Sequence, residues 1–143
     1  MATAASNGTS IRQLPPLQLA FPLPSSPDTR MHIHLTAHSH SLVLFVHTSS
    51  AMTPSSGSAS LGSFVFSLQN QLHPTEQPLS TPLYTSTHTV DFATRLAKIL
   101  ARRTNRPAYV GASDVKFWAP EDESAAMKGV VDIVLEGLRR AGK

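Results

Sequence analysis

The sequence contains no cysteine, which excludes disulfide bonds, zinc–thiolate sites and cysteine nucleophiles together. Aromatic residues make up only 6% and charged residues only 15% of its 143 residues. No apolar run approaches the ~18 residues that a membrane-spanning helix needs, and the first residues lack the apolar segment of a secretory signal. Since the absence of cysteine suits a reducing compartment, we expect the protein in the cytoplasm, with the nucleus as a further location, and without a membrane partner.

Residues for catalysis are also missing or wrongly spaced. No serine lies in a G-x-S-x-G motif, and neither a P-loop nor a G-x-G-x-x-G motif occurs. The acids Glu121, Asp122 and Glu123 are adjacent at the start of a predicted helix, where the helix dipole favours negative charge. A catalytic carboxylate pair instead converges from separate positions. We therefore expect no catalytic residues, and the protein is not expected to be an enzyme.

The histidines raise the question of a metal site. Four of them share even numbering, so a strand would project them on one side: His32, His34, His38 and His40. An H-x-H pattern on a strand can bind zinc or copper. However, no carboxylate lies between Asp28 and Glu76 to orient such ligands, and an outward polar face explains the same alternation. We expect no metal site and no cofactor.

The most informative segment present is an amphipathic stretch over residues 87–112. Its apolar side chains recur at helical spacing on one face: Phe92, Ala93, Leu96, Ala97, Ile99 and Leu100. Thr87 or Thr89 is expected to cap the start of this helix. Asn105 is expected to take the left-handed conformation at its end, where Pro107 prevents continuation. The pattern predicts a helix that lies on a core and is followed at once by a strand.

Positive charge is concentrated on this same helix. The segment from Asp91 to Arg106 holds five basic residues and one acid, whereas the whole chain has a net charge of +3. Its basic side chains are the candidates for partner binding: Arg95, Lys98, Arg102, Arg103 and Arg106. Most lie opposite the apolar face, where a merely solvated surface is the alternative. Arg103 falls near the apolar side, so it either packs along the edge of the core or contacts a partner.

The rest of the chain predicts an α+β domain: a small, mainly antiparallel sheet of about five to six strands packed with two helices. Alternating and apolar segments predict a hairpin and three further strands, over residues 30–37, 42–47, 61–68, 79–85 and 108–112. A second helix is expected to start at the acids from Glu121 and to present an apolar stripe from Val130 to Leu138.

The predicted domain occupies residues 30–143, with a surface loop rich in Ser and Gly at residues 49–60. Residues 1–29 are expected to form a disordered or extended tail, because five prolines between Pro15 and Pro27 disfavour a helix. The alternation of Leu17, Leu19 and Phe21 allows an alternative in which this tail adds an edge strand once docked.

A longer string over residues 92–115, FATRLAKILARRTNRPAYVGASDV, resembles the helix–strand unit of the proteasome assembly chaperone 4 family. In that family a helix end of the form R-[KR]-T-N-[KR] leads into a short apolar strand. The segments SLVLFV (residues 41–46) and LSTPLYT (residues 79–85) resemble the family's second strand and the strand before the helix. The similarity covers roughly residues 31–115, with a gap at the Ser- and Gly-rich loop.

This resemblance implies a chaperone subunit that promotes assembly of the 20S proteasome α-ring. It implies a heterodimer with a sister protein, proteasome assembly chaperone 3, and binding of proteasome α-type subunits, notably the fifth. Among the positions that match the family's motif, Arg95 and Arg102 are candidates for contact, whereas Leu96 and Ala97 suit structural roles.

The alternative function is a small basic module that binds nucleic acid. A basic helix is the usual footprint of such proteins. Against it, the basic residues are confined to one helix, and the few aromatic residues show no stacking series along a strand. We therefore expect no nucleic-acid partner.

Overall fold

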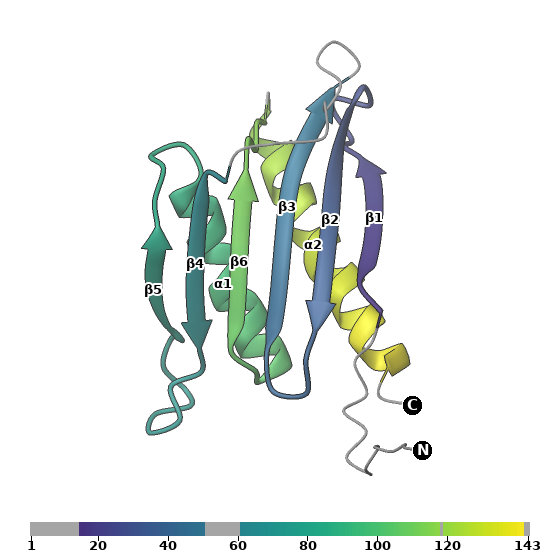
Figure 1. Ribbon diagram of the computed structural model, residues 1–143. Helices are drawn as coiled ribbons and strands as arrows, with labels where there is room; N and C mark the ends of the chain where they lie inside the picture. The colour runs from purple at the N-terminus through teal and green to yellow at the C-terminus, as the bar shows by residue number, and fades with distance from the viewer. Residues whose placement is uncertain (1–14, 51–60, 118, 142–143) are drawn as a thin grey trace, which may run out of the picture.

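The computed structural model describes residues 15–50, 61–117 and 119–141, which form one sheet with two helices on the same face (Figure 1). The strands are β1 (Leu17–Pro22), β2 (Thr29–Ala37), β3 (Leu42–Ser50), β4 (Ser63–Leu68), β5 (Leu79–Tyr84) and β6 (Ala108–Ser113). The helices are α1 (Val90–Thr104) and α2 (Pro120–Ala141). This architecture confirms the predicted α+β fold. Neither helix is long and apolar enough to cross a membrane.

The six strands follow the spatial order β1-β2-β3-β6-β4-β5. Every neighbouring pair is antiparallel except β3 and β6, which run parallel at the centre of the sheet. The sheet is therefore mainly antiparallel, as predicted, but its central parallel pair was not foreseen. This pair arises because the chain leaves β3, builds β4, β5 and α1, and then returns to place β6 between β3 and β4.

The predicted hairpin forms from β2 and β3, which pair antiparallel with Ile33 opposite Val46. Its turn is closed by the amide of His38, which donates to the carbonyl of Ser41 at 2.9 Å. On the side that faces the helices, Ile33 and Val46 are buried together with Leu44. The alternation of buried and half-buried residues along β2 confirms the period-two pattern seen in the sequence.

The first strand corrects the predicted start of the domain. Instead of a tail that ends at residue 29, residues 17–22 pair antiparallel with β2 as an edge strand, from Leu17 opposite Leu35 to Pro22 opposite Arg30. The docked strand is therefore the alternative that forms. Residues 1–14 lie outside the described residues. Of the predicted loop at 49–60, Ser49 and Ser50 belong to β3 and residues 51–60 lie outside the described residues.

Helix α1 packs on the sheet through the predicted apolar face. Its buried side chains are Phe92, Ala93, Leu96, Ala97, Leu100 and Ala101. Asn105 ends the helix in the left-handed conformation, at φ 55°, as predicted. The predicted side-chain cap at the start is wrong: Thr89 occupies the N-cap position, but its hydroxyl makes no capping hydrogen bond. It lies 2.7 Å from the hydroxyl of Ser63 instead.

Helix α2 covers the half of the sheet that contains β1 and β2, as Figure 1 shows. A close approach to β1 is possible because Gly129 has no side chain: a Cβ there would lie 2.8 Å from the ring of Phe21. At the start of α2, the buried carboxylate of Asp122 accepts a hydrogen bond from the amide of Ser25 at 2.9 Å. These contacts attach the edge strand and the loop after it to the helix layer.

A buried polar group on β4 holds the entry to α1. The hydroxyl of Ser63 accepts a hydrogen bond from the amide of Ser86 at 2.9 Å and lies 2.7 Å from the hydroxyl of Thr89. Ser67 lies four residues further along β4 on the same face and is equally buried, but its hydroxyl donates only to the carbonyl of Leu79, at 2.8 Å. Ser63 therefore satisfies groups that would otherwise have no partner.

Replacing this hydroxyl tests its role. We expect Ser63→Ala to lower the free energy of unfolding by about 1–3 kcal/mol, because the part-buried amide of Ser86 and the buried hydroxyl of Thr89 both lose their partner. Ser67→Ala is the matched control and is expected to cost less, about 1 kcal/mol, because a carbonyl tolerates the loss of one donor better. Urea denaturation followed by circular dichroism measures both. Equal losses would show that Ser63 does not organise the start of α1.

Candidate protein-interaction surfaces

The face of the sheet opposite the helices is the first candidate surface. Both helices lie on the other face, and no described helix or strand covers this one (Figure 1). We call it the open sheet face. Its central strands carry a cluster of large apolar side chains, which we call the open-face cluster: Val43, Phe45, Phe64, Phe66, Leu68 and Tyr109.

Gly111 on β6 sits at the centre of this cluster. Phe45 of β3 and Phe64 of β4 are both paired with it across the sheet. Their rings stack over the glycine with centroids 5.8 Å apart and an interplanar angle of 5°. A Cβ at position 111 would lie 2.5 Å from the ring of Phe45, so only glycine lets the ring lie flat across the strand. Tyr109 continues the series, with its ring centroid 6.0 Å from that of Phe64.

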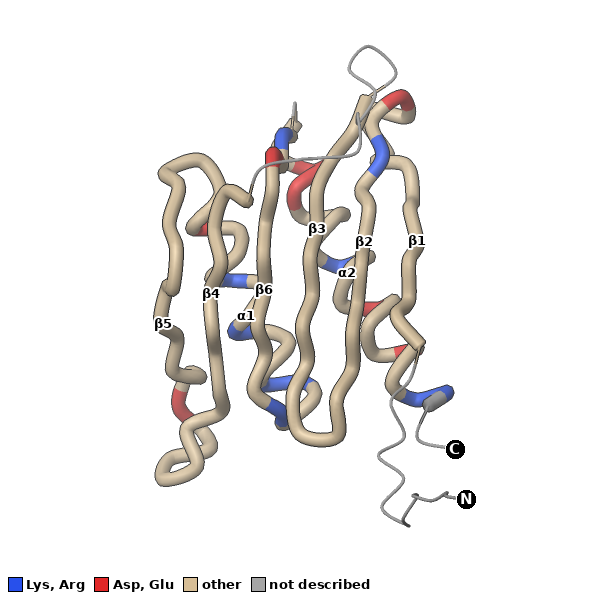
Figure 2. Tube along the Cα trace, viewed as in Figure 1, with Lys and Arg blue, Asp and Glu red and all other residues tan. Residues whose placement is uncertain are grey.

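This surface is apolar and almost uncharged. Arg30 is the only Lys, Arg, Asp or Glu in the six strands, and Figure 2 shows the strands otherwise free of charged residues. Phe45, at the middle of the cluster, is 39% exposed to solvent. Contiguous apolar surface of this kind marks a protein-interaction site, because a partner that covers it removes apolar area from water and so lowers the free energy.

Histidines occupy one margin of the open sheet face. The rings of His32 and His47 stack with centroids 4.6 Å apart, and the Nε2 atom of His32 lies 2.6 Å from the hydroxyl of Ser49. His38 and His40 lie in or beside the β2–β3 turn and are exposed, so the four histidines of even number do not lie together along one strand. Among the described residues there is no group of three or more acids and histidines that could hold a metal ion.

The environment of the stacked pair disfavours its charged form. Partial burial lowers the pKa of His32 below its ordinary value, and the positive charge of Arg30 lowers it further. Burial also lowers the pKa of His47, followed by the effect of His32, while Asp114 acts in the opposite direction. Two imidazoles stacked in this way would repel each other if both were protonated.

The second candidate surface is the basic side of α1, where the predicted binding residues lie. Arg95 forms an ion pair with Glu123 of α2 and so joins the two helices. Lys98, Arg102 and Arg103 make no ion pair or hydrogen bond with any described residue. Arg106 lies beyond the end of the helix, where its Nη1 donates to the carbonyl of His38 at 3.3 Å. The structure therefore leaves three of the five predicted cations available to a partner.

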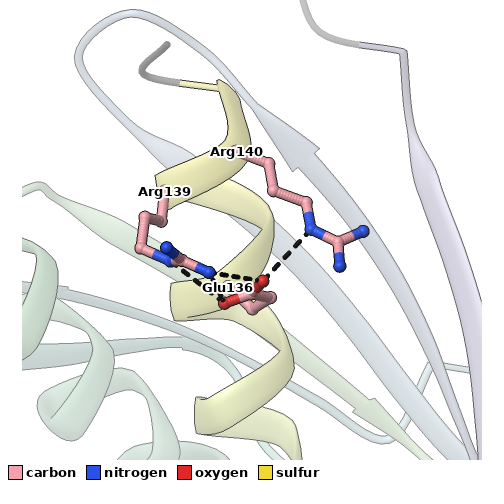
Figure 3. Close-up of polar contacts among 3 residues, drawn as sticks. All are labelled: Glu136, Arg139 and Arg140. Atoms are coloured by element: carbon pink, nitrogen blue, oxygen red, sulfur yellow. Dashed lines mark hydrogen bonds and ion pairs between the residues drawn. The ribbon is translucent and has the colours of Figure 1, made fainter.

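The end of α2 provides a contrast. Arg139 and Arg140 both donate to the carboxylate of Glu136, at 2.8 and 3.1 Å (Figure 3). The hydrogen bond from Arg139 is the main reason that the pKa of Glu136 is lowered. These two cations are already partly neutralised within their own helix. Free positive charge in the described residues is thus concentrated on α1.

The open-face cluster is what sequence reasoning missed. The sequence shows no aromatic series along a single strand, but the strand order brings rings from β3, β4 and β6 together into a series across the strands. A signal was available: Val43 and Phe45 are apolar although they alternate with buried Leu42 and Leu44. A strand that is apolar on both faces needs a cover on both faces.

An uncovered apolar sheet face and a basic helix on the opposite side define the class of the protein: a protein-interaction module. The sequence matches the family described as Proteasome assembly chaperone 4 over residues 30–113, and the chain belongs to this family. The fold resembles that of a chain in a crystal structure described as a novel chaperone complex for yeast 20S proteasome assembly. The TM-score is 0.61 with 17% sequence identity, covering 88% of this chain and 95% of the other. No curated protein matches the sequence.

The histidine pair generates a prediction about pH. Because the folded state lowers the pKa of His32 and His47, the unfolded chain binds protons more readily than the folded chain. Their contribution to stability is therefore complete above the unfolded pKa of about 6.5 and is lost as the pH falls below it. We expect the thermal midpoint to fall between about pH 7 and pH 5, and His47→Gln to reduce this dependence.

His40→Gln is the matched control, because His40 is exposed in the β2–β3 turn. It should leave the pH dependence of the thermal midpoint as it is in the unaltered protein. If His47→Gln and His40→Gln gave the same pH profile as the unaltered protein, the stacked pair would not contribute to acid sensitivity.

Proposed function

We propose that the protein is one subunit of a heterodimeric chaperone that promotes assembly of the 20S proteasome α-ring. Its sister subunit is proteasome assembly chaperone 3, and its cargo is a proteasome α-type subunit, notably the fifth. Membership in the proteasome assembly chaperone 4 family supports the general role. The similar fold belongs to a chain of a chaperone complex, and this supports the proposal that the protein acts together with another subunit. A chaperone identity also implies a binding protein rather than an enzyme.

The open sheet face is the single observation that supports the heterodimer most strongly. Phe45, Phe64 and Tyr109 form a stacked apolar surface on strands that have no charged side chain at their centre. Burial of such surface against a second sheet would give a core with helices on both outer sides, which is a common way to complete a layered fold. We therefore assign this face to the sister subunit.

Assignment of the sheet face to the sister leaves the helix layer for the cargo. Lys98 and Arg102 of α1 lie in this layer and have no partner among the described residues. Their charge favours an acidic surface on the α-type subunit and speeds the encounter with it. In this proposal the dimer holds a subunit edge, blocks wrong neighbours, and leaves when later subunits claim the same surface. Tighter binding to the intermediate than to the finished particle gives the process its direction.

Proteasome assembly of this kind takes place in the cytoplasm and nucleus in our proposal, which agrees with a chain free of cysteine. Epitope tagging at the C-terminus and fractionation of native cells would locate it.

A substitution in the open-face cluster tests the heterodimer. We expect Phe45→Glu to weaken association with the sister subunit by at least about 30-fold, because it places a charge at the centre of a desolvated apolar interface. The fold should persist, since Phe45 points away from the helix-covered core. Co-expression followed by size-exclusion chromatography with light scattering measures the loss of the dimer.

Leu72→Glu is the matched control. Among the described residues Leu72 is the most exposed large apolar one, at 87%, and it lies in the loop between β4 and β5 rather than on the open sheet face. The same chemical change there should leave the dimer intact. A dimer that survives Phe45→Glu but not Leu72→Glu would assign the interface to a different surface.

The nucleic-acid module is the competing function, and the aromatic series gives it one supporting observation. Stacked rings on a sheet can hold bases. Phosphates would need cations beside those rings, but Lys98, Arg102 and Arg103 lie in the helix layer on the opposite side of the sheet. This separation favours protein partners.

Salt distinguishes the two functions. Nucleic-acid binding falls steeply as ionic strength rises, because bound counterions are released on association. A dimer that rests on apolar burial should keep its affinity to within about threefold between low and moderate salt. Co-purification from native cells should recover assembly chaperone and proteasome subunits. Recovery of RNA or DNA without any proteasome subunit would overturn the proposed function.

A further inference from the structure

A groove lies between α1 and α2 in the helix layer, on the opposite side of the sheet from the open face. Its volume is about 560 Å³. We call it the interhelical groove. Its walls come from both helices: Arg95, Ile99 and Arg103 on α1, and Glu123, Ser124, Met127, Lys128, Val131 and Asp132 on α2.

The floor of the groove is apolar. Ile99 and Met127 are half-buried and Val131 is buried, so the bottom of the groove presents aliphatic and thioether surface. Methionine adapts its shape easily and is frequent where a protein accepts side chains from a partner. Arg95, Ile99 and Arg103 recur every four residues along α1, so this wall extends over eight residues, or about 12 Å. That length accommodates about two turns of a third helix.

The rim of the groove has an unbalanced charge. Arg95 and Glu123 neutralise each other at one end. Arg103 and Lys128 are exposed cations with no ion pair among the described residues. Of the two acids in the lining, Asp132 is likewise exposed and without an ion pair to a described residue. Lys98 and Arg102 add further unpaired positive charge on the adjacent surface of α1. An incoming segment therefore meets apolar surface flanked by positive charge.

From these features we propose that the interhelical groove binds an acidic amphipathic helix of the α-type proteasome subunit that the chaperone carries. Apolar side chains of that helix pack on Ile99 and Met127, and its flanking carboxylates pair with Arg103 and Lys128. The inference rests on the proposed function, because it takes the cargo from there. It also gives Arg103 a role: this side chain is neither buried at the core edge nor bonded to the last carbonyls of α1.

Charge reversal at the rim tests the groove. The heterodimer with Arg103→Glu and Lys128→Glu is expected to bind the recombinant 20S α-type subunit about tenfold or more weakly than the unaltered heterodimer, because two favourable charges become unfavourable. Surface plasmon resonance with each purified α-type subunit as probe measures this. The matched control is Lys116→Glu with Arg139→Glu, which changes the charge equally at exposed positions outside the groove. The control should bind within about twofold of the unaltered heterodimer.

A second variant is expected to strengthen binding, a result that damage to the fold cannot imitate. Asp132→Asn removes the unpaired acid of the groove and should raise the affinity for the same subunit by about threefold, because it removes repulsion from the carboxylates of the cargo helix. Assembly with the sister subunit should be unchanged in all variants, which verifies that each one is folded.

The outcomes separate the two proposals. If the unaltered heterodimer forms and binds an α-type subunit, but the rim variants bind it equally well, the groove is not the site and the proposed function stands. If the unaltered heterodimer binds none of the α-type subunits, the proposed function itself fails, and the groove loses its assigned partner with it.

Discussion

The sheet has apolar side chains on both faces, but the two helices of the chain cover only one of them, and the rest of the structure depends on this imbalance. The central strands β3, β6 and β4 carry apolar side chains on both faces, but both helices lie on one face. On the helix side, Leu44, Val110 and Val65 are fully buried. On the other side, Phe45 and its neighbours stack on one another and stay in contact with water. A partner that covers this face completes a second core, so the fold and the proposed association have the same physical cause.

The apolar surface and the charged surface also lie on different sides of the sheet. Charged residues are almost absent from the strands and collect in the helix layer, as Figure 2 shows. Apolar contact suits a lasting subunit interface, whereas exposed cations steer a transient partner and respond to salt. In the proposed function, the chaperone keeps its sister subunit and releases its cargo, and it therefore needs both kinds of surface. Because the two surfaces lie on opposite sides of the sheet, the two proposed partners would not compete for the same site.

Features encoded in short stretches of sequence were predictable. The hairpin of β2 and β3 follows from alternation, and α1 follows from its apolar spacing together with Asn105 and Pro107 at its end. The clustering of cations on one helix is also visible without coordinates, whereas their role in partner binding stays a prediction. Prediction failed where the outcome depends on contacts between distant residues. The docking of β1 depends on Phe21 meeting Gly129, which is more than a hundred residues away.

The surfaces themselves required the strand order. Phe45 and Phe64 meet only because β6 enters between their strands and places Gly111 beneath both rings. Likewise, the position of α2 against α1 decides that Arg95 forms an ion pair with Glu123, whereas Arg103 is left without an ion pair to a described residue. For a similar reason the hydroxyl of Thr89 does not cap α1 as the sequence predicts. It contacts the buried hydroxyl of Ser63 on β4 instead.

The most direct test of the central claim is the solvent exposure of position 45 in the free chain and in the complex. A 4-fluorophenylalanine at this position can be followed by fluorine NMR in the presence of a soluble paramagnetic probe, which accelerates relaxation of exposed nuclei. We predict strong relaxation enhancement in the free chain and its near-complete loss when the sister subunit is added. Unchanged enhancement at position 45 in a complex shown to be fully formed would contradict the assignment of the open sheet face.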